Sequence, residues 1–386
     1  MANFLADNEK SKDLSRLLDI SMHMITKTDL GSLLGLIMEE ATKTMHADRS
    51  TLYLIDHERN ELISFIAQQS EIKEIRLPFG TGIAGYVAKH GNTINIEGAY
   101  KSPLFNKETD IQTGYSTRTV LCVPMKNREG EIIGVLQVLN KKTGMFTEYD
   151  EWLFTTYANY AATAIENVRL HEEREKTFLS AIKALAAAID CRDPVTAGHS
   201  ERVARLSVDI GKSLSLSKNE LKMLNYAATL HDVGKIGVKD AILLKPGEFT
   251  LEERNEMDKH VVYTKEILDE VYFTKDFKLI PTIAAMHHER LDGTGYPYNL
   301  NAEQLNILGR IIAVADIFDA LVSYDRPYKK AISLSDALDI LRDEAEKKHL
   351  DAHVVRVFIE KKVYLHTFPD IENRSCRYER ENIDRI

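Results

Sequence analysis

Residues able to bind metal ions gather in the second half of this 386-residue chain. Imidazole nitrogens combined with carboxylate oxygens suit Fe, Mn or Zn, whereas Mg²⁺ and Ca²⁺ prefer shells of oxygen alone. A single helical histidine is more often a core or surface residue, but adjacent pairs of such residues favour ligands. A set without cysteine also indicates a catalytic rather than a structural site. The candidate ligands are His199, His231, Asp232, His260, His287, His288 and Asp316.

Two short strings surround the paired residues. In LHDVGKIG, Lys235 follows His231 by four residues, so a continuing helix places it on the same face. There it could meet a phosphate, although a solvated lysine in the last helical turn remains the alternative. In HHERLDGTGYP, residues 287–297, we expect a helix that ends in two histidines and runs into a loop. The glycines of this loop allow it to fold tightly over a site.

These strings resemble the HD-GYP family, phosphodiesterases of the HD superfamily that hydrolyse cyclic di-GMP. The family pattern HHExxDGxGYP is met at residues 287–297 and the pattern HDxGK at 231–235. TAGHSERV upstream and VADIFDAL downstream also fit, and the resemblance covers about residues 175–365. It implies a C-terminal all-α HD-type helical bundle that converts cyclic di-GMP to pGpG, GMP or both.

The resemblance also implies roles for individual residues. One ion would be held by His199, His231, Asp232 and Asp316, and Asp232 would bridge to a second ion on His260, His287 and His288. The catalytic residues would be Asp232 and Lys235, with Lys235 beside the phosphate. Further substrate contacts would come from Tyr296, Arg326 and Lys329. Three matching carboxylates could stand behind the ligands or be structural, namely Glu289, Asp292 and Asp319.

The expected number of ions is two. Some family members carry a glutamate one helical turn before the first histidine and bind a third ion. Val195 occupies that position here and cannot ligate, while Asp193 lies before Pro194. We therefore expect two divalent ions, Fe or Mn rather than Zn, that activate a bridging water for in-line attack on the phosphodiester.

Two kinds of pattern divide the chain. Residues 1–168 combine helices at 8–28 and 29–46 with apolar runs separated by turns, which predicts an α+β domain with a central antiparallel sheet. Residues 147–190 contain no proline or glycine and predict one long helix that links two domains and pairs with a second copy. Two helices with a break near His171 are the alternative. Helical patterns continue through 175–365, among them 218–232, 251–270 and 279–288, and a polar tail follows at 366–386. Ser217 with Glu220 and Thr250 with Glu253 predict two of the helix starts.

The first domain resembles a GAF sensor domain. GTGIAGYVAKHG, TRTVLCVPM and GVLQVLNKKTGMFTEYDE carry this resemblance across residues 12–168. The NKFDE pattern of cyclic-nucleotide-binding GAF domains is matched by Asn140, Lys141, Phe146, Asp150 and Glu151. The match implies a cyclic nucleotide, another small ligand, or dimerisation alone. Alternatively, Lys141 and Asp150 form an ion pair that locks the last strand to the following helix.

A glycine pattern at residues 80–85, GxGxxG, mimics a dinucleotide fingerprint, with Glu97 at a suitable distance. That fingerprint needs a parallel βαβ unit, and the neighbouring strands are predicted to be antiparallel. We therefore interpret the pattern as a glycine turn that starts a helix.

Composition narrows the function further. The net charge of −9 argues against a broad basic surface for DNA, and no apolar run approaches the length of a membrane span. Three separated cysteines and a polar start favour the cytoplasm. We expect a dimeric signalling hydrolase. The alternatives are 3′,3′-cyclic GMP-AMP or linear pGpG as substrate, or a non-catalytic scaffold that recruits GGDEF-type cyclases through the GYP loop.

Overall fold

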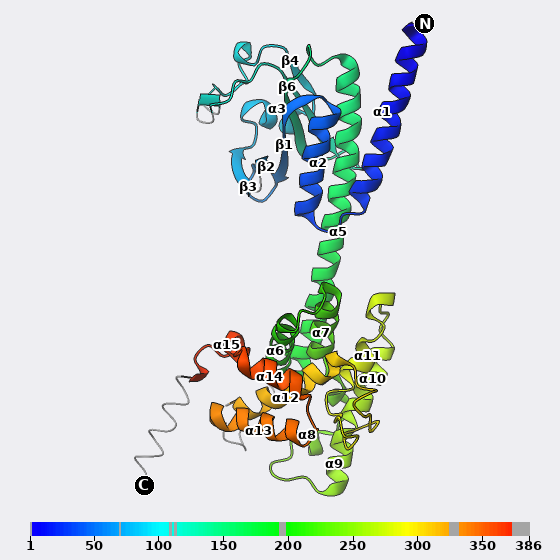
Figure 1. Ribbon diagram of the computed structural model, residues 1–386, viewed down its shortest axis with the longest axis vertical. Helices are drawn as coiled ribbons and strands as arrows, with labels where there is room; N and C mark the ends of the chain where they lie inside the picture. Colours follow the sequence, from blue (N-terminus) through cyan, green and yellow to red (C-terminus); the bar gives the residue numbers. More distant parts are fainter. Residues whose placement is uncertain are drawn as a thin grey trace. The chain divides into compact units, whose positions relative to one another are not determined.

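An antiparallel sheet lies at the centre of the first of the two units into which the chain divides, residues 1–175 and 176–386. The computed structural model describes residues 2–68, 71–107, 110–111, 114–192, 198–323 and 332–372. The sheet has the order β3-β2-β1-β6-β5-β4, and every neighbouring pair is antiparallel (Figure 1). Its strands are β1 (Ala47–Asp56), β2 (Glu61–Gln68), β3 (Glu71–Pro78), β4 (Ile94–Ile96), β5 (Val120–Lys126) and β6 (Ile132–Lys141). The antiparallel α+β prediction is confirmed.

Helices cover both faces of this sheet. One face packs against α1 (Ala2–Ile25), α2 (Leu30–Thr44) and the beginning of α5 (Glu148–Arg192). The other face packs against α3 (Gly82–His90), which starts at the predicted glycine turn, and the short 3₁₀ helix η1 (Ala99–Lys101). Helix α2 shows why these helices form, because Asp29 caps its first turn and its apolar residues recur at helical spacing on the buried face.

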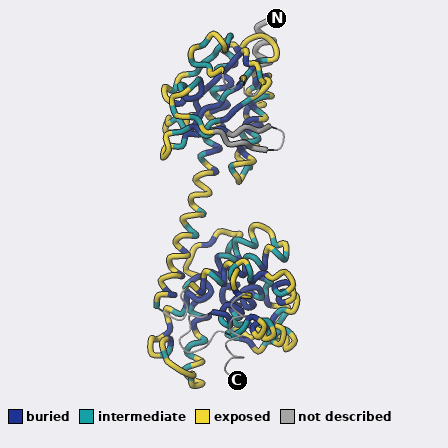
Figure 2. Tube along the Cα trace, turned by 90° about the vertical axis from the view of Figure 1, so that its left-hand side faces the viewer, coloured by how far each residue is buried: buried dark blue, intermediate teal, exposed yellow. Residues whose placement is uncertain are grey.

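The helix α5 has 45 residues and belongs to both units. Thr147 and Asp150 exchange hydrogen bonds at its start, as a capping box requires. Its residues 169–174 are exposed, whereas buried residues gather inside each unit (Figure 2). Among the described residues, no helix is long and apolar enough to cross a membrane.

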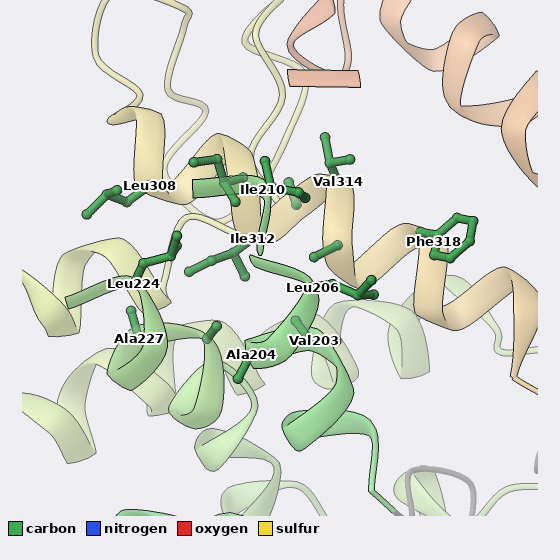
Figure 3. Close-up of a cluster of buried hydrophobic side chains, with 14 of the residues drawn as sticks. Val203, Ala204, Leu206, Ile210, Leu224, Ala227, Leu308, Ile312, Val314 and Phe318 are labelled. Carbon is green, nitrogen blue, oxygen red and sulfur yellow. The ribbon is translucent and has the colours of Figure 1, made fainter. Parts of the chain in front are cut away.

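The second unit is mostly helical. Helices α6, α7 and α12 form its core, where apolar side chains from all three meet (Figure 3). Its α-helices are α6 (His199–Ser213), α7 (Lys218–Leu230), α8 (Asp240–Leu243), α9 (Leu251–Asp258), α10 (His260–Asp269), α11 (Ile280–Ala284), α12 (Ile307–Val322), α13 (Leu334–Glu346), α14 (Ala352–Glu360) and α15 (Tyr364–Thr367). The described part of this unit also contains the 3₁₀ helices η3 (Val233–Gly237) and η4 (Lys275–Phe277).

Several helices end earlier than their patterns predict. The pattern at 218–232 stops as a helix at Leu230, and the one at 279–288 stops at Ala284. The pattern at 251–270 is two helices, α9 and α10, separated at Lys259. Each break lies within three residues before a candidate metal ligand, for a reason that the site geometry makes clear.

Candidate metal centre

Seven imidazole and carboxylate side chains from separate helices converge in the second unit. His199 begins α6 and His260 begins α10, while His231 follows α7. Ligand atoms within 4.8 Å of one another form three groups, and all the candidate ligands of the sequence belong to them. The groups are His260 with His287 and His288, His199 with His231 and Asp316, and His231 with Asp232 and His287.

The Asp232 carboxylate lies between these groups. Its Oδ2 is 3.5 Å from Nε2 of His231 and 3.9 Å from Nε2 of His199. Its Oδ1 is 3.4 Å from Nε2 of His260 and 3.8 Å from Nε2 of His287. One carboxylate therefore presents one oxygen to each of two sets of imidazoles, which is the arrangement of a bridging ligand.

Three of the histidines are oriented by the same local device. Nδ1 of His231 lies 2.7 Å from the carbonyl oxygen of Ala228, three residues earlier, and His260 and His287 repeat this contact with the carbonyls of Met257 and Ala284. Each carbonyl belongs to the last turn of a helix, where no intrahelical amide is available to it. The imidazole satisfies that carbonyl, so the helix ends and Nε2 is aimed into the site.

The fourth histidine is oriented from a distant helix. Nδ1 of His199 donates to Oδ2 of Asp319 at 2.7 Å, and Asp319 is fully buried in α12. Arg202 grips the same carboxylate through Nε at 2.7 Å and Nη2 at 3.0 Å. Asp319 therefore stands behind a ligand rather than among the ligands, and such partners fix the tautomer of a metal-binding histidine.

The donor set fits divalent cations. A carbonyl oxygen can only accept, so Nδ1 of His231, His260 and His287 carries the hydrogen and Nε2 carries a lone pair. These three Nε2 atoms are buried and have no hydrogen-bond partner. They face carboxylate oxygens, which also only accept. Buried nitrogen and oxygen acceptors that face one another at these distances are stabilised only by a positive charge between them.

The protonation states also suit metal binding. Burial, which disfavours the charged form, lowers the pKa of His288 to about 3 and lowers the pKa values of His260 and His287. Burial opposes ionisation of Asp232 and Asp316, but Lys235 and nearby imidazoles hold the pKa of Asp232 below its usual range, and His199 with other imidazoles does the same for Asp316. Burial also disfavours the charged form of His199, but its contacts with Asp316 and Asp319 raise its pKa to about 9. Near neutral pH the site therefore offers neutral imidazoles at His260, His287 and His288 and ionised carboxylates at Asp232 and Asp316, whereas His199 must lose a proton when an ion binds.

Lys235 reaches the site by a different path from the one predicted. The helix does not continue past His231; instead Lys235 lies in the 3₁₀ helix η3, and the prediction of a shared helical face was wrong. Its Nζ lies 2.7 Å from Oδ2 of Asp232, three residues earlier. The tighter 3₁₀ turn places the ammonium on the bridging carboxylate.

Comparisons with known proteins agree with this division of the chain. Residues 29–165 match the family described as GAF domain, and residues 183–354 match the family described as HD domain. The chain is a GAF domain followed by an HD domain. Both resemblances drawn from the motifs are thereby confirmed.

Several of the similar proteins are bacterial phosphodiesterases. The 3′3′-cGAMP-specific phosphodiesterase 3 of Vibrio cholerae is 43% identical over 162 residues, which are 42% of this chain and 34% of that protein. The cyclic di-GMP phosphodiesterase response regulator RpfG of Xanthomonas campestris is 42% identical over 170 residues, 44% of each chain. The cyclic di-GMP phosphodiesterase of Thermotoga maritima is 35% identical over 225 residues, 58% of this chain and 56% of that one. The chain thus matches between about a third and just over half of each relative's length.

In the HD domain, the GYP loop lies beside the histidines. The ring of Tyr296 stacks near His288 with centroids 4.8 Å apart. Glu289 is buried and accepts from the amides of Tyr298 and Leu300, and Asp292 accepts from the amide and hydroxyl of Thr294. Glu289 and Asp292 therefore shape the loop and are not placed to bind an ion. Gly295 permits the fold, since a Cβ there would lie 2.3 Å from a backbone nitrogen.

Three residues of the site predictions lie outside the described residues. These are Arg326, Lys329 and Val195. Two further residues were missed by the sequence reasoning, although their spacing signals them. Arg202 is three residues after His199 and Thr264 is four residues after His260, so each shares a helical face with a ligand.

In the GAF domain, the five residues of the NKFDE pattern form an interlocking set of contacts. Lys141 forms an ion pair with Asp150, which confirms the alternative that this pair links the last strand to the following helix. The amide of Asn95 donates to the carbonyl oxygen of Phe146 and to Glu151, both at 2.8 Å. Asn140 is buried and accepts from the amides of Arg118 and Thr119, just before β5. The contacts of Lys141 and Asn95 therefore join β6 and β4 to the start of α5 and the loop before it, whereas Asn140 joins the end of β6 to the segment before β5.

Proposed function

We propose that this chain is a metal-dependent phosphodiesterase that hydrolyses cyclic di-GMP to pGpG, GMP or both under the control of its GAF domain. The observation that carries the proposal is the position of Asp232, whose two oxygens face two sets of orphaned imidazole nitrogens. Paired cation sites of this kind suit the clamping of a phosphodiester. The names of the relatives point to the same class of substrate.

The proposed ions are two, with Fe or Mn preferred because the ligands are nitrogen and oxygen. His199, His231, Asp316 and Oδ2 of Asp232 would hold one, and His260, His287, His288 and Oδ1 of Asp232 would hold the other. Divalent ions there would activate water and offset negative charge on the phosphate.

The chain's own groups complete the proposed reaction. Lys235 brings an ammonium beside Asp232, where it can meet a phosphoryl oxygen. Tyr296 screens the His288 side of the site from water. Burial keeps the imidazoles of His260, His287 and His288 neutral, so they hold no proton that must leave before an ion binds. Asp319 keeps His199 turned with Nε2 towards the site, and the proton that its carboxylate partners hold on this imidazole would leave when an ion binds.

The test is hydrolysis by purified protein reconstituted with Fe(II) or Mn(II) under reducing conditions. Chromatography separates pGpG from GMP, and metal analysis of the same sample counts the ions. The His231→Ala/Asp232→Ala variant should be inactive and should bind less metal. His171→Ala/Glu172→Ala is the matched control, since it removes an exposed adjacent histidine and acid. Full activity in the first variant would contradict the site assignment.

A second candidate substrate is 3′,3′-cyclic GMP-AMP. Two relatives from Vibrio cholerae, 43% and 36% identical over their matched parts, are named for that nucleotide. The same assay with both cyclic dinucleotides at equal concentration separates the two proposals through kcat/KM. Linear pGpG as a third substrate shows whether hydrolysis continues to GMP.

We further propose a homodimer formed through the helices that flank the GAF domain. Leu14, Leu18, Met22 and Ile25 recur at helical spacing on α1 and have exposed fractions of 48%, 52%, 64% and 66%. Exposed apolar stripes of this kind support a partner helix. Sedimentation of the chain should give the dimer mass, and Leu18→Glu/Met22→Glu should give the monomer.

The GAF domain supports a small-ligand proposal as well. A cavity of about 1110 Å³ is lined by Arg49, Tyr115 and the first turn of α3, among others, and none of the NKFDE residues lines it. We therefore propose that a cyclic nucleotide or another small ligand binds in this cavity, and that the NKFDE residues act as a lock. We also propose that the GYP loop binds a cyclase partner and that the protein is cytoplasmic. The proposed domain limits are 1–168, 147–190, 175–365 and 366–386.

A further inference from the structure

The last residue of α5 holds the 3₁₀ helix that carries Lys235. Nη1 of Arg192 donates to the carbonyl oxygens of Ile236 at 2.5 Å and Lys235 at 3.2 Å. Its Nη2 donates to the carbonyl oxygen of Val238 at 2.7 Å and to Asp240 at 2.7 Å. A single guanidinium therefore contacts three backbone carbonyls within four residues at the end of η3.

These carbonyls lie at the end of a short helix, and that of Lys235 also accepts from the amide of Val238 at 3.1 Å. The final carbonyls of a helix lack intrahelical amides, and they attract a positive charge. A guanidinium has five donors in a planar fork, so it can satisfy several acceptors at once. A lysine at the same position has a single ammonium centre and cannot reproduce this geometry.

The contact bears directly on the candidate site. Asp232 caps η3, and the amide of Lys235 donates to the carbonyl oxygen of Asp232 at 3.0 Å. The Lys235 ammonium then returns to Oδ2 of Asp232 at 2.7 Å. Because Arg192 fixes the carbonyl of Lys235, it limits how far the ammonium can move from the bridging carboxylate.

The same turn of α5 also reaches the other ligand-bearing segment. Asp190 is buried and accepts a hydrogen bond from Ser200, the residue after His199, at 3.1 Å. One helical turn thus holds the start of α6 with Asp190 and the end of η3 with Arg192. The helix that ends in this turn begins in the GAF domain, at Glu148.

We propose that Arg192 is a positioning residue for Lys235, and that the last turn of α5 is the contact through which a movement of α5 alters turnover. The part that concerns turnover rests on the proposed phosphodiesterase function. The part that concerns the geometry of η3 does not, so the two can be tested apart.

The test is a double-mutant cycle in the full chain with its metal bound. Arg192→Ala should lower kcat/KM about 10- to 100-fold, because small displacements of a catalytic group have effects of this size. Lys235→Ala should also lower it, and Arg192→Ala/Lys235→Ala should match Lys235→Ala within about twofold, since coupled residues are not additive. Arg192→Lys should recover only part of the loss.

The matched control is Asp240→Asn. It weakens the two hydrogen bonds that Arg192 makes to this exposed carboxylate but leaves the three carbonyl contacts in place. It should stay within about threefold of wild type in kcat/KM. Thermal melting and metal content of every variant show whether a loss of activity reflects a loss of folded, metal-loaded protein.

Hydrogen exchange of backbone amides tests the contact between Arg192 and η3 without any substrate. Amides of residues 233–238 should exchange about tenfold faster in Arg192→Ala than in wild type, while those of α12 should not change. If wild type proves inactive on every nucleotide, the proposed function fails and this exchange result still decides the positioning role. Unchanged exchange, or additive effects of the two substitutions on kcat/KM, would overturn the proposal.

Discussion

Asp319→Asn should loosen His199 and weaken one half of the metal centre. The wild-type carboxylate accepts a hydrogen bond from His199, two from Arg202 and one from the hydroxyl of Ser323 at 3.1 Å. An asparagine at this position has a single acceptor oxygen, so its NH₂ group must face the donor of either His199 or Arg202. The substitution keeps the size of the side chain and removes its charge.

The expected magnitude follows from these contacts. Removing one partner of a buried pair costs about 3–5 kcal/mol, but the Arg202 side chain is 23% exposed and can recover some hydration. We expect a loss of about 2–3 kcal/mol, or roughly 5–10 °C in the melting temperature of metal-free HD domain. Metal affinity at the His199 side should fall about 10- to 100-fold, as it does when a group behind a ligand is removed.

The assay is a metal titration of the full chain, followed by metal analysis after dialysis at limiting free metal. Wild type should hold two ions under conditions where Asp319→Asn holds about one. Asp209→Asn is the matched control, because it makes the same change on α6, the helix of His199, in an ion pair with Lys212 at 2.8 Å, whose side chain is 61% exposed. A variant at Asp319 with unchanged melting temperature and unchanged metal ratio would refute the role given to this carboxylate.

Three further predictions concern the packing around η3 and the GAF lock. Thr264→Val should cost about 2–4 kcal/mol in a chemical-denaturation assay, because its buried hydroxyl joins the Gly234 amide to the His231 carbonyl and both would be left unpaired. Gly234→Ala should prevent metal binding or folding of the HD domain, seen by metal analysis and circular dichroism, since a Cβ would lie 1.9 Å from a backbone oxygen of α10. Asp150→Asn should destabilise the GAF domain more at pH 6 than near pH 3. Burial opposes ionisation of Asp150, but Lys141 and nearby donors lower its pKa, so its contribution is present above the unfolded value of about 3.9 and is lost as pH falls through the folded pKa. Equal melting differences at the two pH values would contradict this last prediction.

Much of the architecture could be predicted from local sequence. Ser217 with Glu220 and Thr250 with Glu253 predict helix starts, and both pairs form capping boxes in the structure. The apolar runs with turns between them predict the antiparallel sheet, because a two-residue period and a short connection are local properties of the chain.

The ends of the metal-bearing helices could not be predicted in the same way. Apolar periodicity continues through 218–232, yet the helix ends at Leu230 because His231 takes the carbonyl of Ala228. That contact is favourable only when Nε2 of His231 faces the other ligands of the site, and their positions depend on other helices. Local patterns carry no information about those neighbours.

The types and order of the candidate ligands were determined by the sequence itself. Paired histidines and carboxylates, their neighbouring glycines and the GYP loop define the chemistry, and the motif match followed from residues that lie close together in the chain. Only the tertiary structure decided which oxygen of Asp232 faces which imidazoles, that Asp319 stands behind His199, and that Arg192 holds the backbone of Lys235. These pairs are separated by tens of residues or join a side chain to a backbone carbonyl. Neither kind of contact leaves a periodic signal, because it is set by the packing of helices and not by the spacing of residues along one of them.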